Sequence, residues 1–175
     1  MRVLVTGGVR SGKSHHAEHL LEGEASVTYV APGPDETEEP DPDWALRLAA
    51  HRGRRPAHWT TVETADVATA IQQSAGPVLV DCLGTWLTRT IDQQGLWEAP
   101  VDEVTERVRE EITRVVAALE RDHPVVLVTN EVGLGVVPAH RSGRLFRDLL
   151  GETNRQVAAA CEQVHLVIAG RVLVL

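Results

Sequence analysis

The sequence is poor in cysteine, cationic residues and long apolar runs, and each shortage excludes a class of protein. Two cysteines in 175 residues cannot build the disulfide framework of a small secreted domain, so a reducing, cytoplasmic setting is expected. No apolar run is long enough for a membrane span, and Met1 leads directly into a strand pattern without a signal peptide. The net charge of −8 disfavours nucleic acid as a partner, because phosphate backbones attract basic surfaces.

The rest of the composition suits one α/β domain over residues 1–175, since 43% of the residues are hydrophobic and no internal repeat interrupts them. Short buried-type runs alternate with helical patterns, which predicts a mostly parallel sheet flanked by helices. The expected strands are 2–6, 27–31, 60–63, 77–81, 125–129, 164–169 and 172–175, the last as a short antiparallel edge strand. The expected helices are 14–21, 44–50, 66–73, 85–90, 102–121 and 140–164, with Gly151 as a candidate break in the last.

Residues 7–14, which read GGVRSGKS, carry the strongest chemical signal in the chain. They fit the phosphate-binding pattern G-x-x-x-x-G-K-[S/T], and they lie between an expected strand and an expected helix, as this loop requires. Glycines let the backbone N–H groups surround a phosphate, while the lysine reaches the outer phosphates and the hydroxyl ligates Mg²⁺. The predicted nucleotide-binding loop comprises Gly7, Gly8, Val9, Arg10, Ser11, Gly12, Lys13 and Ser14, with Lys13 catalytic and Ser14 a metal ligand.

Lys13 is also the only lysine in the sequence, and every other strong cation is an arginine. A genome rich in G and C would explain the arginines, but it would not explain why the single exception falls at this position. Lysine is a compact point charge on a flexible stem, and arginine does not replace it at such a site. The composition therefore agrees with the motif.

A second informative stretch, residues 51–59, reads HRGRRPAHW and holds three arginines in an otherwise acidic protein. Arginine clusters bind phosphate through paired hydrogen bonds, and a neutral imidazole beside them is able to attack phosphorus. Spacing alone does not choose between His51 and His58 as that nucleophile. The alternative is a solvated basic turn.

Acidic residues at strand ends supply further candidates. Asp81 ends a buried strand, where P-loop proteins hold Mg²⁺ directly or through water, although an acid that caps the next helix is the alternative. Glu131 follows another central strand and is equally well explained as a catalytic group or as a residue that orders its loop. His15, His16 and His19 are expected to form a solvated helix face rather than a metal site. Residues 32–43 are acidic and rich in proline, which predicts a surface loop.

Four segments together resemble one family, the bifunctional adenosylcobinamide kinase / adenosylcobinamide-phosphate guanylyltransferases of coenzyme B12 assembly. They are TGGVRSGKS at 6–14, HRGRRPAHW at 51–59, the acid at position 81, and VLVTNEVGLGVVP at 126–138. The resemblance implies a RecA-like P-loop fold and a homotrimer. It also implies phosphorylation of the corrinoid substrate by ATP or GTP, and then transfer of GMP from GTP through a GMP-histidine at His51.

The resemblance extends the nucleotide contacts beyond the P-loop. The implied residues are Ala31, Pro32, Gly33, Arg52, Gly53, Arg54, Arg55, Glu63 and Asp81, with Mg²⁺ held by Ser14 and Asp81. The acidic loop departs from the family pattern, so loss of one of the two activities is an alternative. Two others are a P-loop small-molecule kinase without a covalent intermediate and a non-enzymatic module, or motor ATPase, that binds nucleoside triphosphates. The last four arginines before the final strands, Arg141, Arg144, Arg147 and Arg155, are expected to face solvent or a neighbouring subunit.

Overall fold

The computed structural model describes residues 1–33, 53 and 55–175, so the helix expected over 44–50 lies outside the described residues. The strands are β1 (Arg2–Gly7), β2 (Thr28–Ala31), β3 (Thr60–Glu63), β4 (Val78–Asp81), β5 (Val125–Val128), β6 (Gln163–Ile168) and β7 (Arg171–Val174). The helices are α1 (Lys13–His19), α3 (Val67–Gln73), α4 (Leu83–Gln93), α5 (Val101–Ala118) and α6 (Arg141–Ala160).

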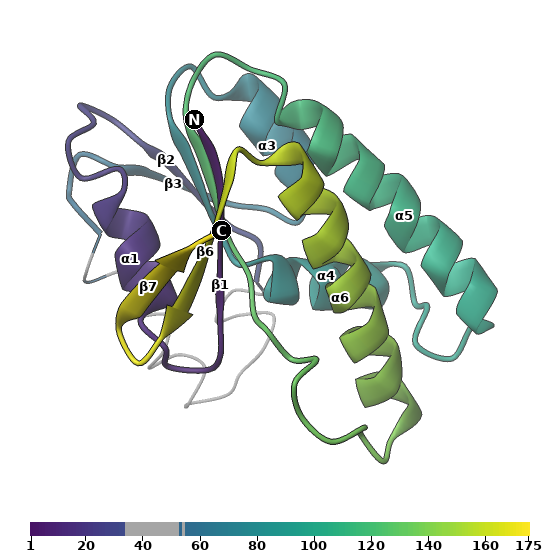
Figure 1. The fold of residues 1–175 in the computed structure, drawn as a ribbon. Coiled ribbons are helices and arrows are strands. Elements are labelled where there is room, and N and C mark those ends of the chain that lie inside the picture. The colour runs from purple at the N-terminus through teal and green to yellow at the C-terminus, as the bar shows by residue number, and fades with distance from the viewer. Residues whose placement is uncertain (34–52, 54) are drawn as a thin grey trace.

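The seven strands form one sheet in the order β3-β2-β4-β5-β1-β6-β7, and only the last pair, β6 with β7, is antiparallel (Figure 1). The predicted fold class and the antiparallel edge strand are therefore confirmed. β5 lies between β1, which leads into the P-loop, and β4, which ends at Asp81. This interposed strand is the arrangement expected of a RecA-like sheet.

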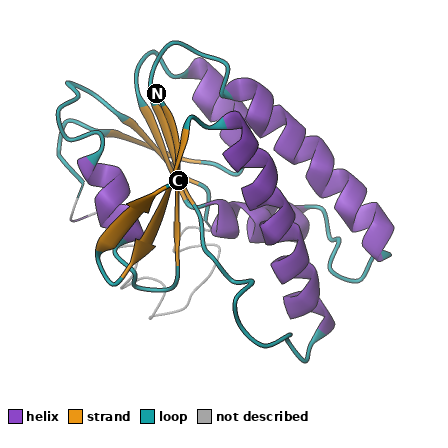
Figure 2. Ribbon diagram, viewed as in Figure 1, coloured by secondary structure: helices purple, strands orange, loops and turns teal. Residues whose placement is uncertain are grey.

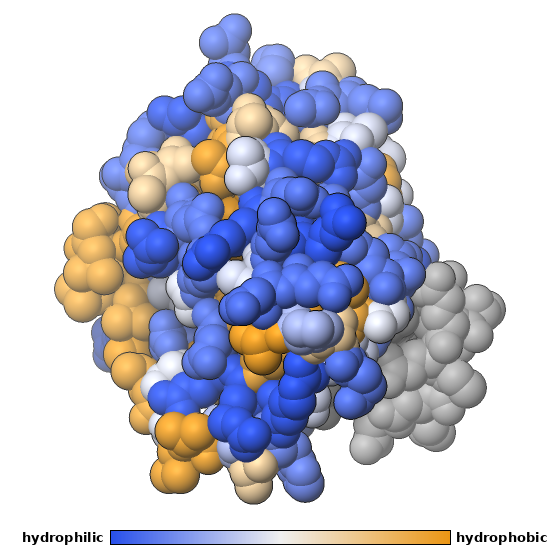
Figure 3. Space-filling model, turned by 90° about the vertical axis from the view of Figure 1, so that its right-hand side faces the viewer, coloured by the Kyte–Doolittle hydropathy of each residue, from blue (hydrophilic) through white to orange (hydrophobic). Residues whose placement is uncertain are grey.

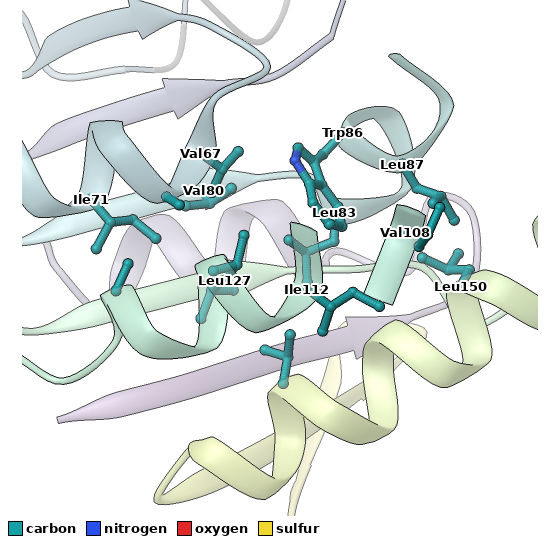
Figure 4. Close-up of a cluster of buried hydrophobic side chains, with 14 of the residues drawn as sticks. Val67, Ile71, Val80, Leu83, Trp86, Leu87, Val108, Ile112, Leu127 and Leu150 are labelled. Atoms are coloured by element: carbon teal, nitrogen blue, oxygen red, sulfur yellow. The ribbon is translucent and has the colours of Figure 1, made fainter. Parts of the chain in front are cut away.

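Helices cover the two faces of the sheet unequally (Figures 1 and 2). α5 and α6 lie on one side, with α3 and α4, while α1 lies on the opposite side. The larger buried cluster packs the first group against the sheet, and its labelled members include Trp86 of α4, Ile112 of α5 and Leu150 of α6 (Figure 4). α5 presents Val104, Val108, Ile112 and Val115 at steps of three or four residues, which explains why one stripe of this helix is buried.

The smaller cluster lies beneath α1, where Ala17 and Leu21 pack with Tyr29, Trp59 and residues of the central strands. Its alternation with the larger cluster follows from the strand period: in β5, Val125 and Leu127 belong to one cluster, and Val126 and Val128 to the other. The central strands are therefore apolar on both faces, as parallel strands covered by helices must be.

Two expectations for the C-terminal half are wrong. α6 runs without interruption from Arg141 to Ala160, and Gly151 does not break it. A glycine inside a helix costs about 1 kcal/mol relative to alanine, a cost that the packing of Leu149 and Leu150 on α4 and α5 offsets. The expected helix also extends too far: α6 ends at Ala160, and residue 163, placed in that helix from the sequence, belongs to β6, whose expected strand began at 164.

Of the four arginines expected to face solvent or a neighbouring subunit, Arg144 and Arg155 are exposed. The structure adds that three of the four bind main-chain carbonyls of nearby loops. Arg141 donates to the carbonyls of Trp97 and Ala99, and Arg147 donates to the carbonyl of Gly133 at 2.8 Å. Arg144 donates to Ala139 at 2.6 Å and to Pro138 at 3.2 Å. These side chains fasten loops to α6.

Within the described residues, no helix is both long enough and apolar enough to cross a membrane.

Candidate nucleotide site

The P-loop is packed so closely that its first glycine cannot be replaced without displacement of main chain. A Cβ atom at Gly7 would lie 2.4 Å from the Val167 carbonyl oxygen of β6 and 2.7 Å from the Ser11 hydroxyl. The loop then turns through Arg10 at φ 54° and Gly12 at φ 96°, both in the left-handed region. α1 begins at Lys13, one residue earlier than the sequence predicts, and His16 N–H donates to the Gly12 carbonyl at 3.0 Å.

The Lys13 ammonium lies over this loop, with Nζ 3.2 Å from the Gly8 carbonyl oxygen. Ser11 N–H donates to the same carbonyl at 3.3 Å, which closes the loop on itself. The sole lysine and the loop backbone are therefore brought together as the motif predicts, with Ser14 next in the first turn of α1. This arrangement suits the oxygens of a polyphosphate.

The other predicted positions lie at the ends of neighbouring strands. Ala31 of β2 is paired with Glu63 of β3, and Thr64 N–H donates to the Ala31 carbonyl at 3.2 Å. Gly33 is held by Arg89 of α4, which donates to its carbonyl at 2.8 Å. Pro32 is the buried residue between them. The parallel strands thus place this turn, Glu63, Asp81 and the P-loop at one edge of the sheet, where open α/β proteins bind ligands.

Asp81 stands two strands away from the P-loop. It is paired with Val128 of β5, which is paired in turn with Val5 of β1. Strands are about 4.8 Å apart, so roughly 10 Å of sheet separates the Asp81 backbone from β1. Its carboxylate accepts a hydrogen bond from the buried Tyr29 hydroxyl, 2.9 Å from Oδ2. Burial and the nearby Asp81 raise the pKa of Tyr29 well above 10, so the phenol stays protonated and donates.

Arg55 joins this pair from the other side of the Tyr29 ring. Its guanidinium carbon lies 3.6 Å from the ring centroid, a stacked cation–π arrangement, and NH1 donates to the Thr61 hydroxyl at 3.0 Å. Its buried Nε has no hydrogen-bond partner among the described residues. Tyr29 therefore connects the strand-end carboxylate to the arginine-rich stretch, a connection that no local sequence pattern signals.

The remainder of the arginine-rich stretch is only partly described. His51, Arg52 and Arg54 lie outside the described residues. Gly53 and His58 are exposed, and Trp59 is buried beneath α1. The structure thus brings Arg55 to the strand edge, and His51 stays a prediction.

Glu131 orders its own loop, because its Oε1 accepts the Gly133 N–H at 2.8 Å. Its backbone N–H donates to the Gly7 carbonyl at 3.1 Å, so the segment after β5 starts beside the P-loop. Of the two explanations left open from the sequence, the observed contact supports loop ordering. The main-chain carbonyl of the neighbouring Asn130 accepts a hydrogen bond from the side-chain amide of Asn154 in α6, at 3.0 Å. This bond anchors the same segment to α6.

His16 of α1 and His165 of β6 form a pair that no sequence pattern predicts. His16 Nε2 lies 2.8 Å from His165 Nδ1 of β6, and the other nitrogen of His165 lies 3.0 Å from Gln163 Oε1. The expectation of a solvated face is therefore wrong for His16, whereas His15 and His19 are exposed. Burial, and for His16 the other histidines too, lowers the pKa of both paired imidazoles.

The donor set fits magnesium better than a transition metal. The described residues hold no group of three or more His, Cys, Asp or Glu side chains able to bind a metal ion. Mg²⁺ needs only one or two protein oxygens, because phosphate oxygens and water complete its shell. A serine hydroxyl at position 14 and a carboxylate at Asp81 are ligands of that kind.

The chain is similar to proteins of one family along nearly its whole length. The family model described as cobinamide kinase / cobinamide phosphate guanyltransferase matches residues 3–175. The bifunctional adenosylcobalamin biosynthesis protein CobU of Escherichia coli (strain K12) is 41% identical over 97% of each chain, and that of Salmonella typhimurium is 39% identical over the same shares. CobP of Pseudomonas aeruginosa is 37% identical over 97% of this chain and 94% of its own. Among solved structures, the P4 protein from bacteriophage phi6 in complex with ADP is similar at a TM-score of 0.39 and 15% identity, over 98% of this chain and 53% of that one.

The histidine pair predicts a loss of stability in mild acid. Both pKa values are lowered in the folded protein, so the unfolded chain binds more protons below its ordinary histidine pKa near 6.5. The contribution is complete above pH 6.5 and is lost as the pH falls through the lowered folded values. Urea unfolding at pH 7.5 and 5.5 should show a smaller acid loss for His16→Gln/His165→Gln than for wild type. The exposed His123→Gln should behave like wild type, and equal losses in all three would contradict the pair's role.

We expect the hydrogen bond from the Tyr29 hydroxyl to Asp81 to contribute measurably to the free energy of unfolding. Tyr29→Phe keeps the ring beneath Arg55 and removes only the donor to the carboxylate, so the free energy of unfolding should fall by about 1–2 kcal/mol. Thr61→Val removes the exposed partner of Arg55 and should change stability by less than about 0.5 kcal/mol. Urea denaturation at pH 7 measures both. An unchanged Tyr29→Phe midpoint would show that the bond adds nothing.

Proposed function

Because the chain belongs to the cobinamide kinase / cobinamide phosphate guanyltransferase family, we propose that it catalyses both reactions of the family's name. It is a bifunctional enzyme that phosphorylates adenosylcobinamide with ATP or GTP. It then transfers GMP from GTP to adenosylcobinamide phosphate and releases pyrophosphate. The observation that supports this most directly is the P-loop at the same sheet edge as Asp81 and Arg55.

The kinase reaction uses the P-loop. A hydroxyl of cobinamide attacks the γ-phosphorus, and the bond from that phosphorus to the β–γ bridging oxygen breaks. Lys13 and the N–H groups of residues 7–14 bind the oxygens on which negative charge accumulates. Ser14 and Asp81 would hold Mg²⁺, which supplies charge neutralisation at the phosphates. Tyr29 orients the Asp81 carboxylate through its hydroxyl.

The guanylyltransferase reaction uses His51 as the nucleophile. Its neutral imidazole attacks the α-phosphorus of GTP, and pyrophosphate leaves. The phosphate of the phosphorylated cobinamide then attacks the GMP-histidine phosphorus and releases the imidazole. Two displacements through a covalent adduct replace one difficult step. Arg52, Arg54 and Arg55, with the backbone at Gly53, bind the phosphates.

The turn Ala31–Pro32–Gly33 and Glu63 complete the nucleotide contacts, on the support of their shared place at the strand ends. The enzyme is a homotrimer in the cytoplasm, with no nucleic-acid partner. Both cysteines are free, which agrees with a reducing compartment. The exposed β7, with Val172, Leu173 and Val174 all more than 40% exposed, supports association between copies.

The covalent step is tested with GTP labelled at its α-phosphate. Label should remain on the denatured wild-type protein, and peptide mass spectrometry should locate GMP on the peptide that contains His51. His51→Ala should carry no label, whereas His58→Ala, in the same stretch, should be labelled like wild type. An unlabelled wild-type enzyme that still makes phosphorylated cobinamide would favour the kinase without an intermediate. Label retained in His51→Ala would refute the assignment of this histidine.

The shared P-loop predicts that Lys13→Ala weakens both reactions. Loss of one pre-positioned cation should lower the kinase turnover and the rate of labelling each by on the order of 100-fold. Lys13→Arg should not restore them, because the guanidinium differs in shape and hydrogen bonding. Single-turnover assays with each nucleotide measure the two rates, with an unchanged urea midpoint as the folding control. Normal labelling in a kinase-dead Lys13→Ala would mean two separate sites.

A further inference from the structure

We propose that the segment 132–138, which follows β5, is the surface on which the corrin ring of the substrate docks. The inference rests on the proposed function, since it takes cobinamide as the acceptor. It goes beyond that function by assigning the ring to Leu134, Val136 and Val137. A corrin macrocycle is broad and carries methyl groups as well as amide side chains on its rim, so its apolar parts can pack on an apolar surface beside the phosphate site.

Three large apolar side chains within four residues are left in water on this segment. The exposed fractions are 90% for Leu134, 95% for Val136 and 63% for Val137. Single exposed apolar side chains are ordinary, but several together mark a binding surface. Figure 3 shows a mostly hydrophilic α5–α6 side with hydrophobic groups at its left edge and at its base, and the base is the end toward which this segment projects in Figure 1.

The backbone of the segment is fastened while these side chains stay outside. At its start, the Gly133 N–H is bound by Glu131 and the Gly133 carbonyl by Arg147, each at 2.8 Å. At its end, Arg144 binds the carbonyls of Pro138 and Ala139. A surface that is already ordered loses little conformational freedom when a ligand binds, which favours affinity.

The segment lies beside the P-loop, and this position favours the corrinoid as the molecule that binds there. Glu131 N–H donates to the Gly7 carbonyl, so the segment starts directly beside the P-loop. Seven residues span at most about 25 Å, and the acceptor hydroxyl must reach the γ-phosphate that this loop binds. Leu134 and Val136 therefore lie close enough to the P-loop for the body of a bound corrinoid to contact them.

A second copy of the chain is the other candidate, and β7 fits it better. β7 is the outermost strand, pairs only with β6 among the described strands, and exposes the apolar residues of its whole length. An edge strand of this kind pairs readily with another chain. It lies beyond β6, on the other side of β1 from the segment after β5. The two apolar surfaces are thus distinct. The β6–β7 turn contacts the P-loop at Ser11, and Glu131, at the start of the segment 132–138, contacts it at Gly7, but of the two only β7 presents an unpaired strand edge to another chain.

The double variant Leu134→Ser/Val136→Ser tests the assignment. Both side chains are nearly fully exposed, so the fold should be retained. In the kinase reaction the KM for cobinamide should rise about tenfold or more, which corresponds to about 1.4 kcal/mol of lost binding. The KM for ATP should not change, and neither should labelling by GTP, which needs no corrinoid. Equilibrium dialysis, read by the visible absorbance of cobinamide, should show the same loss in affinity.

Val101→Ser, half-exposed at the start of α5, is the matched control and should leave every value unchanged. An unchanged KM and affinity in the double variant would overturn the assignment while wild-type activity upholds the proposed function. A changed mass in solution with unchanged corrinoid affinity would overturn it too, and would identify the segment as a subunit contact. A wild-type protein that neither binds nor phosphorylates cobinamide would refute the proposed function, and this inference with it.

Discussion

The structure depends on the close approach between the P-loop and the turn that joins β6 to β7. At Gly7 only a hydrogen atom fits beneath the Val167 carbonyl, and Gly170 N–H donates to the Ser11 carbonyl at 2.8 Å. The turn reaches this position because Ala169 and Gly170 take φ values of 49° and 76°, the left-handed conformation of a tight two-residue hairpin. A motif encoded at residues 7–14 is therefore shaped by residues more than 150 positions later.

Gly7 also contacts the segment on the other side of β1. Its carbonyl accepts Glu131 N–H from the segment after β5, so both strands that flank β1 contribute contacts at the P-loop. β5 in turn separates β1 from β4, which sets the spacing between the phosphate loop and Asp81. Two strand spacings, roughly 10 Å, therefore separate the Asp81 backbone from β1.

The sequence predicts what depends on neighbours along the chain. The buried strand runs, the stripe of α5 and the P-loop each carry a local signature, and each is found where the pattern indicates. The pairs His16–His165 and Tyr29–Asp81 join residues 149 and 52 positions apart, and periodicity contains no strand order from which to infer them. The contacts of Arg141, Arg144 and Arg147 with loop carbonyls are hidden from the sequence for a related reason. An arginine in a helix looks solvated until a loop carbonyl is known to lie within its reach. Gly151 misleads because the low helix propensity of glycine is a small effect, and the packing of its neighbours on two other helices outweighs it.

A net charge of −8 would repel a triphosphate if it were spread evenly over the surface, but the charge is not evenly distributed. Acidic residues of the helical side are paired on the helices themselves: Glu152 with Arg109, at 2.5 Å, and Asp66 with Arg114, at 3.0 Å. These exposed pairs add little stability, but they offset negative potential away from the sheet edge. At the edge itself, among the described residues, the groups that attract phosphate act at short range and in fixed directions: backbone N–H groups, Lys13 and Arg55. The field at contact distance, rather than the sum over the chain, decides whether a phosphate binds. A strand-end carboxylate such as Asp81 would repel the phosphates if no cation lay between them, which supports the proposed Mg²⁺.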